Sequence, residues 1–378
     1  MRIGFDLRPF LKHETGVGVY LRNLLFELAR IDAENEYFLF SASWKDRFPE
    51  SRVPPFKNGR FRDFRWPVKA VNFCWQRLGG PTLDAIFRER LDITHSPSPL
   101  ALPTKGKRVV TVCDLFFMEF PEEADREARR IFYKKAEQSL RRADGIIAIS
   151  EFTKNALQER FGLGEDRIRV THLGLGDIYR KKTGGGSVEA ARRSFGLPPR
   201  FLLFVGASEK RKNLPALIDA LAVLRDRNKL FPLVIVGRHG GDHARLVGRI
   251  KEHGLASSVR ILGYLPEADV RSLYGAASAF VFPSSCEGFG LPLLEAMAVG
   301  LPVAASNVAA IPEIAGEAAL YFDPRDPEDI AEKLVRVLED DELRRSSKTR
   351  GLERVSGFTW EKTAALTLDY YKSLVGNR

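Results

Sequence analysis

Two glutamates stand eight residues apart in the segment EGFGLPLLEAMAVG, which runs from 287 to 300. The apolar run before the segment predicts a strand, and Pro292 and Gly300 predict the first turn and the end of a helix. Glu287 then lies in the loop, and Glu295 lies about one turn inside the helix. At a rise of about 1.5 Å per residue, we expect the two carboxylates to be farther apart than the roughly 5 to 9.5 Å of a hydrolase acid and base. This spacing favours two carboxylates that hold the two ends of one long ligand.

Backbone amides lie between these two glutamates. Phe289, Gly290 and Leu291 stand at the predicted helix start, where N–H groups without intrahelical partners can bind phosphate or sugar hydroxyls. A carboxylate that binds a ribose diol is the chemistry of dinucleotide sites. A nucleotide sugar, with its order of sugar, diphosphate, ribose and base, fits this layout.

A basic turn is expected in FVGASEKRKNLPALIDAL, from 204 to 221. A strand leads through Gly206 to Arg211 and Lys212, which stand just before the next helix. The positive end of the helix dipole and the two bases favour an anion such as a diphosphate. A solvated basic turn has the same pattern and is the alternative.

A third glycine-rich turn contains Gly16 and Gly18 in TGVGVYL, between a strand and a helix. Backbone without Cβ atoms at such a junction can approach phosphate or sugar. The turn lacks the third glycine and the acidic residue of the dinucleotide fingerprint. An ordinary tight turn is therefore the alternative.

Length and composition set the frame for these motifs. The chain has 378 residues, 44% of them hydrophobic and 29% charged, which favours two globular domains over a disordered or fibrous chain. No apolar run reaches the length of a membrane span, and the first residues lack the apolar core of a secretory signal, so we expect a cytoplasmic protein. The three cysteines, Cys74, Cys113 and Cys286, are odd in number and far apart, which favours reduced thiols over disulfides or a zinc site.

The net charge of +10 is concentrated in two stretches. Nine basic residues alternate with aromatic ones from Lys45 to Arg77, and the second stretch, from 126 to 144, has helical spacing with Ile131, Phe132, Ala136 and Leu140 as its apolar side. A solvated surface is one interpretation, and a surface that docks on anionic lipid or an anionic acceptor is another. Nucleic acid is disfavoured because no binding signature accompanies the charge.

Short apolar runs alternate with amphipathic helical patterns along the chain, which is typical of βαβ units. The expected strands are RIGFDL, YFLFSA, ITHSP, RVVTVCD, GIIAIS and IRVTHL in the first half, and RFLLFVG, PLVIVG, VRILGYL, AFVFPS, PVAAS and AALYFDP in the second. Such continuous apolar strands belong to parallel sheets covered on both faces. The triple glycine at 184 to 186 separates the two series and is interpreted as a linker. The expected fold class is α/β, with two doubly wound domains.

Taken together, these segments resemble the retaining family 4 glycosyltransferases of the GT-B fold, whose hallmark is a glutamate, seven residues and a second glutamate. Besides Glu287 and Glu295, the resemblance extends over FDLRPF, TGVGVYLRNLL, VTVCDLFF, ADGIIAISEFTKNAL, IRVTHLGL, FVGASEKRKNL, IPEIAGEAALYFDP and FTWEKTAALTLDYY, in this order. It implies a Rossmann-like acceptor-side domain over 1–183 and a Rossmann-like nucleotide-sugar domain over 184–357. A helix within 358–378 would cross back to the first domain.

The resemblance also implies a chemistry. A sugar would pass from a nucleoside diphosphate donor to an acceptor with its anomeric configuration retained, without a metal or other cofactor. The sequence agrees on the metal, because no two aspartates stand two residues apart in it. The implied roles are the ribose for Glu295, the donor sugar for Glu287, the diphosphate for Arg211 and Lys212, backbone contacts to the donor for Phe289, Gly290 and Leu291, and the opposite wall of the cleft for Gly16 and Gly18.

The chain departs from the family pattern at VVTVCDLFF, where relatives usually carry a histidine before the aspartate. Here Cys113 precedes Asp114. A neutral thiol is a weak donor and mostly packs, so either Asp114 makes the polar contact alone or the acceptor differs. His13, His95 and His172 are expected at strand ends on the acceptor side, each with a structural or solvated role as the alternative.

The resemblance to bacterial polysaccharide assembly enzymes implies a GDP-sugar donor, with mannose as the first expectation, and UDP-sugars as alternatives. The implied acceptor is a glycan or polyprenyl-linked glycan, and the implied location is the cytoplasm at the inner face of the plasma membrane. A sugar-nucleotide epimerase or phosphorylase-like enzyme of the same fold, and a non-catalytic protein that only binds nucleotide sugar, are the alternatives.

Overall fold

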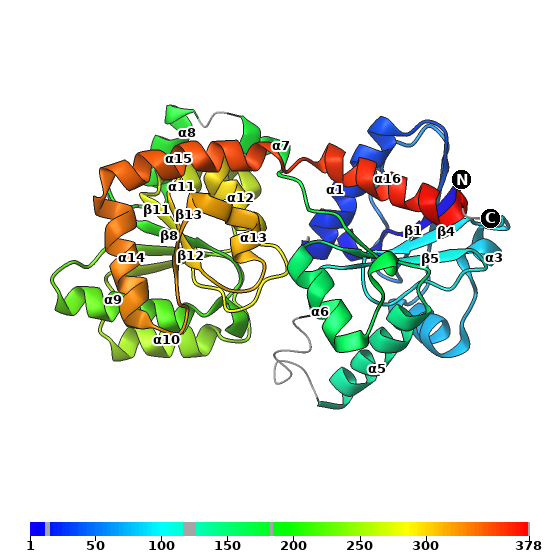
Figure 1. Ribbon diagram of the computed structural model, residues 1–378, viewed down its shortest axis with the longest axis horizontal. Coiled ribbons are helices and arrows are strands. Elements are labelled where there is room, and N and C mark those ends of the chain that lie inside the picture. The colour runs from blue at the N-terminus through cyan, green and yellow to red at the C-terminus, as the bar shows by residue number, and fades with distance from the viewer. Residues whose placement is uncertain (12–15, 116–125, 182–183, 377–378) are drawn as a thin grey trace. The chain divides into compact units, whose positions relative to one another are not determined.

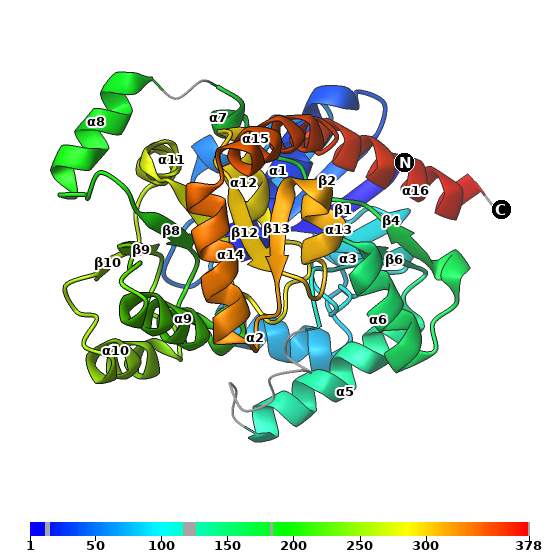
Figure 2. The same cartoon turned by 60° about the vertical axis from the view of Figure 1, so that its left-hand side comes forward.

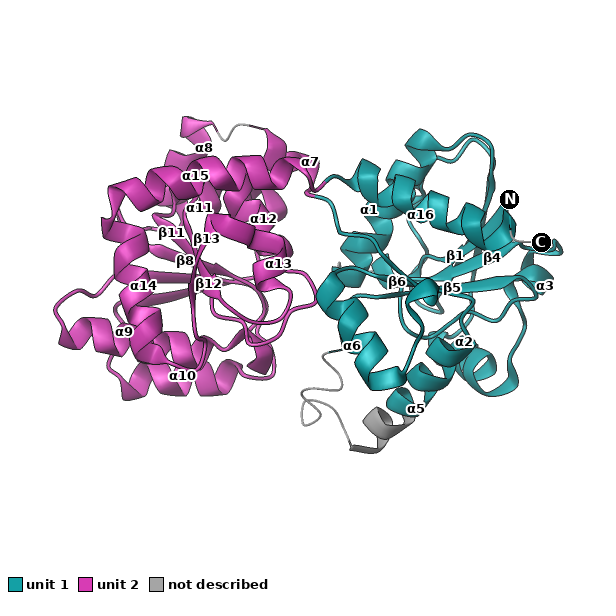
Figure 3. Ribbon diagram, viewed as in Figure 1, with its two compact units in different colours: residues 1–174, 359–378 teal, residues 175–358 magenta. Residues whose placement is uncertain are grey.

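The chain divides into two compact α/β units. The computed structural model describes residues 1–11, 16–115, 126–181 and 184–376. Met1–Gly174 and Thr359–Arg378 form the first unit, and Leu175–Phe358 form the second (Figure 3). The chain therefore passes from the first unit to the second after residue 174, earlier than the expected boundary at 183. It passes back to the first unit at residue 359, one residue later than expected.

The triple glycine is not a linker, which corrects that interpretation. Gly184 is the N-cap residue of helix α8 (Gly185–Ser194), and the other two glycines form its first turn. Helix α8 packs against helix α11 (Glu267–Ala276) of the same unit. Glycine is tolerated at a helix start, where the flanking residue need not be helical.

The first unit contains a parallel sheet with the strand order β3-β2-β1-β4-β5-β6-β7 over its described residues. The strands are β1 (Arg2–Asp6), β2 (Glu36–Ala42), β3 (Gly59–Phe64), β4 (Ile93–Ser96), β5 (Lys107–Val112), β6 (Gly145–Ala148) and β7 (Ile168–Val170). Strand β1 pairs with β2 through Arg2–Glu36 and with β4 through Ile3–Ile93. The sequence predicted all of these strands except β3.

Helices cover both faces of this sheet, as the apolar strands predict. They are α1 (Gly16–Ile31), α2 (Val68–Phe73), α3 (Leu83–Phe87), α5 (Arg126–Arg142), α6 (Glu151–Phe161) and α16 (Trp360–Gly376), with a π-helical turn at Cys74–Leu78. Helices α1 and α16 lie together on one side of the sheet, and α5 and α6 lie on the opposite side (Figure 1). Leu140 of α5 and Leu157 and Phe161 of α6 join Val110 and Ile146 in a buried cluster. Burial of each such side chain contributes about 1.5–3 kcal/mol to the free energy of folding, relative to leaving the side chain exposed.

Helix α16 returns the chain from the second unit to the first, which confirms the expected crossing helix. It packs against α1. A buried polar chain fixes it to the sheet: the hydroxyl of Tyr371 lies 2.5 Å from Nδ1 of His95, and Nε2 of His95 lies 2.7 Å from Oγ1 of Thr111. The same Thr111 oxygen lies 2.8 Å from the hydroxyl of Tyr20 in α1. Burial lowers the pKa of His95 to about 3, so its ring is neutral and structural.

The second unit has a parallel sheet with the order β10-β9-β8-β11-β12-β13 over its described residues. The strands are β8 (Leu202–Val205), β9 (Leu233–Val236), β10 (Val259–Gly263), β11 (Ala279–Phe282), β12 (Val303–Ser306) and β13 (Ala319–Phe322). All six match the strands predicted from the sequence. The strand order reverses between β8 and β11, which pair through Leu203 and Phe280.

Helices also cover both faces of the second sheet. They are α7 (Asp177–Arg180), α8, α9 (Leu214–Asp226), α10 (His243–Glu252), α11, α12 (Leu291–Ala298), α13 (Ile311–Ala315), α14 (Pro327–Glu339) and α15 (Asp341–Ser356). Helix α9 packs against both α10 and α14 (Figure 2), and α12 packs against α15. The result is a doubly wound α/β unit. In such units, ligands bind beyond the carboxyl ends of the strands where the order reverses, and here that position lies beyond β8 and β11.

Candidate functional site

The loops after β8 and β11 meet at the reversal point of the second sheet. After β8 the chain passes Gly206 and forms a short 3-10 helix, Lys210–Lys212, before α9 begins at Leu214. After β11 it forms the loop that carries Glu287. The amide and the hydroxyl of Ser285 donate to the carbonyl of Arg211 at 2.8 and 3.1 Å, which joins the two loops directly.

Glu287 forms a buried ion-pair cluster with both bases of the first loop. Nζ of Lys212 lies 2.5 Å from Oε1 of Glu287, and Nη1 of Arg211 lies 2.7 Å from Oε2. Lys212 and Glu287 are each 7% exposed. Burial alone would raise the pKa of Glu287, but the charges of Lys212 and Arg211 outweigh it and hold the pKa below its usual value. The carboxylate is therefore ionised at neutral pH.

Two further groups complete this cluster. Nη2 of Arg211 lies 2.8 Å from a carboxylate oxygen of Glu209, and the ammonium of Lys212 lies 5.2 Å from the ring centre of Phe282. Gly206 passes so close to this lysine that an added Cβ would lie 3.5 Å from Cε of Lys212. The sequence located Arg211, Lys212 and Glu287 but assigned them to separate parts of a ligand. Their mutual pairing comes from the adjacency of β8 and β11.

Glu295 lies in a different environment, on helix α12. The hydroxyl of Tyr274 in α11 donates to its Oε2 at 2.9 Å, and Tyr179 in α7 also hydrogen-bonds to it. Burial raises the pKa of Glu295 to about 7; the tyrosine hydrogen bonds oppose this rise and the charge of Glu267 adds to it. The carboxyl of Glu295 therefore exchanges its proton near neutral pH.

Sequence reasoning missed both tyrosines. Tyr179 and Tyr274 contact each other edge to face, with ring centres 6.0 Å apart. Tyr274 lies on the apolar side of an amphipathic helix, where a buried phenol needs a hydrogen-bond partner. That need was the available signal, although it does not say which carboxylate the phenol contacts.

The loop and helix start between the two glutamates match the sequence prediction. Helix α12 begins at Leu291, and its N-cap residue Gly290 has a φ of 99°, a conformation that glycine adopts without strain. A Cβ at Gly290 would also lie 2.9 Å from Cδ1 of Leu293. No side chain caps this helix among the described residues. Phe289 is buried and packs edge to face on Phe358. The helix start thus presents backbone amides and a partial positive charge.

Gly16 and Gly18 have different surroundings in the first unit. A Cβ at Gly18 would lie 2.9 Å from the carbonyl oxygen of Pro9, so this glycine permits the close packing of α1 on the preceding turn. An added Cβ at Gly16 meets no described atom within 4 Å. The close contact accounts for Gly18 by packing alone.

The acceptor-side residues follow the strands of the first sheet. Cys113 and Asp114 come directly after β5 and are partly buried. Burial, reinforced by the charge of Asp114, raises the pKa of the Cys113 thiol, so it is not an activated nucleophile. His172 follows β7, and its carbonyl accepts a hydrogen bond of 2.7 Å from Thr363 of α16. His13 lies outside the described residues.

Two kinds of feature are absent from the described residues. No group of three or more His, Cys, Asp or Glu side chains is arranged to hold a metal ion. No helix there is long and apolar enough to span a bilayer.

Comparison with known proteins identifies the family. Residues 15–175 match the model named Glycosyltransferase Family 4, and residues 188–354 match the model named Glycosyl transferases group 1. The O-antigen chain mannosyltransferase B of Escherichia coli is 32% identical, over 99% of this chain and all of that protein.

Solved structures agree on the fold. Sucrose-phosphate synthase from Thermosynechococcus elongatus aligns over all of both chains with a TM-score of 0.76 at 22% identity. The HepE protein of Anabaena, in complex with UDP and glucose, aligns over 99% of this chain and all of its own with a TM-score of 0.75 at 19% identity. With the paired Rossmann-like units and the two motif glutamates in place, these findings show that the chain is a glycosyltransferase of the GT-B fold, with a family 4 N-terminal region and a group 1 C-terminal region.

Proposed function

We propose that the protein transfers mannose from a nucleoside diphosphate donor to a glycan or lipid-linked glycan, with retention of the anomeric configuration and without a metal or other cofactor. The observation that carries this proposal is the buried cluster of Lys212, Arg211 and Glu287 at the reversal point of the second sheet. The choice of mannose is supported by the mannosyltransferase name of the E. coli relative. GDP-mannose is the first donor to test, and UDP-sugars are the alternatives.

The cluster suits the departure of a diphosphate. Lys212 has three N–H donors and Arg211 has five, so both can keep Glu287 and still bind a phosphate oxygen. Donors fixed in advance in a buried site stabilise developing negative charge without reorganising. Glu287 holds the two cations in position, and its own negative charge would stabilise a sugar carbon that becomes positive.

The reaction breaks the bond between the anomeric carbon and the diphosphate oxygen, and the leaving diphosphate takes the electron pair. The acceptor hydroxyl attacks the same face of the sugar, and its proton passes to the departing diphosphate oxygen. The amides at the start of α12, from Phe289 to Leu291, would bind the donor between the two glutamates. Glu295 would accept hydrogen bonds from the ribose diol when it is ionised.

We keep Asp114, Cys113 and His172 as the proposed residues on the acceptor side. Asp114 is the polar group that follows β5, and Cys113 is neutral, so we assign any polar acceptor contact at this position to Asp114. His13 remains a proposed contact on the same side, and Gly16 and Gly18 remain proposed contacts of the first unit to the donor. None of these assignments involves nucleic acid as a partner.

We also propose that the first unit contacts anionic membrane at the inner face of the plasma membrane, in the cytoplasm. The structure narrows the surface available within 45–77. Four of its nine basic residues bind within the unit: Arg47 to Asp63, Arg52 to Phe10, Arg60 to Glu36 and Glu89, and Arg62 to Ile86. Phe48 and Val71 are buried, whereas Trp44 is 68% exposed beside Lys45. The docking surface is therefore smaller than the sequence suggested.

A transfer assay tests the enzymatic proposal. The full-length protein is incubated with GDP-mannose, other GDP-sugars or UDP-sugars, and a lipid extract with glycan acceptors, with and without a chelator. We expect transfer from GDP-mannose that the chelator does not reduce, and NMR of the product should show the anomeric configuration of the donor. An inverted product would exclude retention, and epimerised donor without any transfer would favour the epimerase alternative.

Vesicle binding tests the membrane proposal separately. Sedimentation with anionic vesicles at low salt should retain the protein, and the Trp44→Ser, Lys45→Gln variant should be retained less. Exposed charges are screened beyond about 10 Å at 0.1 M salt, so retention should fall as salt rises. Wild-type protein that stays in solution with anionic vesicles at low salt would refute this docking.

A further inference from the structure

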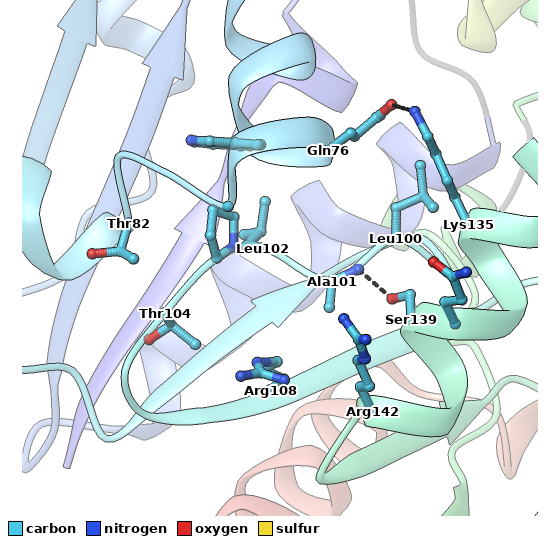
Figure 4. A pocket seen from close by; sticks show the side chains of 14 residues that line it. Gln76, Thr82, Leu100, Ala101, Leu102, Thr104, Arg108, Lys135, Ser139 and Arg142 are labelled. Atoms are coloured by element: carbon cyan, nitrogen blue, oxygen red, sulfur yellow. Dashed lines mark hydrogen bonds between the residues drawn. The ribbon is translucent and has the colours of Figure 1, made fainter. Parts of the chain in front are cut away.

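The first unit contains a concave site, which is separate from the Glu287 cluster of the second unit. It has a volume of about 300 Å³ and lies between the π-helical turn Cys74–Leu78, the loop 100–104 and helix α5. We call it the α5 pocket, defined by the lining residues Trp75, Leu100, Leu102, Arg108, Lys135 and Arg142 (Figure 4). It shares no lining residue with the donor-binding loops of the second unit.

Three cations line the α5 pocket, and its described lining includes no aspartate or glutamate. Lys135 and Arg142 lie seven residues apart on α5, which places them on one face of the helix, two turns apart. Arg108 is the second residue of β5, and its amide donates to a carboxylate oxygen of Asp144 at 2.9 Å. Figure 4 shows Arg108 and Arg142 at the same end of the pocket.

Neighbouring cations form ion pairs with carboxylates. Within the described part of the chain, Arg108, Lys135 and Arg142 do not. Arg141 pairs with Glu137 at 3.0 Å, and Lys107 pairs with Asp144 at 3.1 Å. Nζ of Lys135 contacts the neutral amide oxygen of Gln76 at 2.8 Å, as the dashed line in Figure 4 shows. Like charges gathered without a counter-charge repel one another, and an anion relieves that repulsion.

The remaining lining combines a hydroxyl with apolar surface. Ser139 accepts the amide of Ala101 at 2.7 Å, so its own hydrogen can be donated to a ligand. Trp75, Leu100 and Leu102 provide the apolar wall. On the segment that carries Trp75, Phe73 is 57% exposed and Leu78 is 72% exposed. The pocket thus offers positive charge beside uncovered hydrocarbon.

We propose that the α5 pocket binds the phosphate group of a phosphate ester whose other part is apolar. Guanidinium groups bind phosphate through two parallel hydrogen bonds, so Arg108 and Arg142 at one end of the pocket match a phosphate dianion, and Lys135 adds positive charge two helical turns away. The apolar wall of Trp75, Leu100 and Leu102 matches the hydrocarbon of the ester. This proposal does not depend on the donor, the acceptor or the transfer reaction proposed above.

The test uses geranyl phosphate as the probe and the full-length protein. The pocket variant is Arg108→Gln, Arg142→Gln, and the control variant is Lys134→Gln, Lys372→Gln. Lys134 and Lys372 are exposed residues of the first unit outside the pocket, and the control removes the same charge. Circular dichroism and thermal unfolding establish that each variant is folded.

Calorimetric titration should show geranyl phosphate binding to wild type and to the control with similar affinity, and weaker binding at high salt. The affinity of the pocket variant for geranyl phosphate should be lower by a factor of roughly ten or more, because charge-assisted hydrogen bonds are lost. Inorganic phosphate should bind wild type more weakly than geranyl phosphate does. Equal loss in both variants, or equal affinity for the two probes, would overturn the proposal.

The cations of the Glu287 cluster also attract phosphate, so every titration is repeated with Lys212→Gln added. That change should abolish sugar transfer and leave the pocket affinity unaltered, which keeps the two proposals separable. Loss of all geranyl phosphate binding with Lys212→Gln alone would assign the ligand to the donor site and refute the pocket.

Phosphate esters with hydrocarbon come from two sources, a membrane lipid and a soluble ester. Sedimentation with vesicles of phosphatidic acid and phosphatidylcholine distinguishes them. Weaker retention of the pocket variant than of the control assigns the pocket to a lipid headgroup. Equal retention, together with lost geranyl phosphate binding, assigns it to a soluble ester.

Discussion

The two motif glutamates differ more in their surroundings than their shared helix and loop suggest. Glu287 lies between two cations, and its pKa is held below its usual value despite burial. Glu295 lies among phenols, and burial raises its pKa to about 7. One carboxyl is therefore a permanent charge that positions other charges, and the other is a group whose charge depends on pH.

The difference follows from which elements surround each residue. Glu287 is in the loop after β11, beside the loop after β8 that carries Arg211 and Lys212. Glu295 is one turn inside α12 and faces α7 and α11, whose nearby polar groups are Tyr179, Tyr274 and Glu267. Spacing in the sequence predicts both glutamates near one ligand, and the tertiary neighbours determine the charge of each.

The largest effect is expected from Lys212→Ala. The change removes the buried ammonium that would stabilise the leaving diphosphate, and loss of one such donor costs about 100- to 1000-fold in kcat. Steady-state kinetics with GDP-mannose measure it. Lys210→Ala, in the same 3-10 helix, is the control and should lose far less. An unchanged kcat for Lys212→Ala would remove this lysine from catalysis.

The next effect is on stability, and it compares the same substitution at both glutamates. Glu287→Gln leaves the buried ammonium of Lys212 without its counter-charge, whereas Arg211 keeps Glu209, and breaking a buried ion pair in this way costs about 3 kcal/mol. Glu295→Gln removes a carboxyl whose ionisation burial opposes, so at pH 8 the free energy of unfolding should rise rather than fall. Urea unfolding of the two variants measures both values. Equal losses would show that the two sites are not electrostatically different.

Much of the fold could be predicted because its strands are continuous apolar runs. The strand β8, LLFV, and the strand β9, LVIV, are recognisable because parallel strands covered on both faces carry no polar alternation. Strand β3, GRFRDF, escaped because it is an edge strand, largely exposed, whose arginines bind elsewhere in the unit. The glycines at 184 to 186 were wrongly predicted to form a linker, because their composition suggests flexibility. In the structure they begin helix α8, which packs on α11.

The site could be predicted only to the level of which loops carry it. The sequence predicts Arg211, Lys212 and Glu287 as site residues because bases before a helix and a glutamate before a glycine-rich helix start are local patterns. The ion pair between them could not be predicted, because 75 residues separate Lys212 from Glu287. Only the order of the strands in the sheet brings their loops together. The pH-dependent charge of Glu295 was also out of reach, since it depends on burial and on phenols from two other helices.

A third prediction concerns pH and separates the two carboxyls directly. Because Glu295 has a pKa of about 7, the donor KM should fall as pH rises through 7, by roughly tenfold if the charged hydrogen bonds to the ribose are formed. Glu295→Gln should remove this dependence. Glu287 has a lowered pKa, so its charge should not change in this range.

The same raised pKa fixes the sign of a stability change. The folded state binds the Glu295 proton more tightly than the unfolded state, whose pKa is near the ordinary 4.5. Its contribution to the free energy of unfolding therefore falls as pH rises from about 4.5 to about 7. Urea unfolding across this range should show a steeper fall in wild type than in Glu295→Gln. Identical slopes would mean that Glu295 titrates normally.

The smallest expected effect is from Tyr274→Phe, and it tests the cause of the Glu295 shift. The phenol donates to Oε2 of Glu295 at 2.9 Å and favours the ionised carboxyl. Without it, the midpoint of the donor KM should move to a pH above 7, with a loss of about 1 kcal/mol in the free energy of unfolding. Tyr264→Phe is the matched control, because Tyr264 is 65% exposed and contacts Arg238. A midpoint that moves to lower pH would show that Tyr274 favours the protonated carboxyl, and the contrast between the two glutamates would then rest on burial alone.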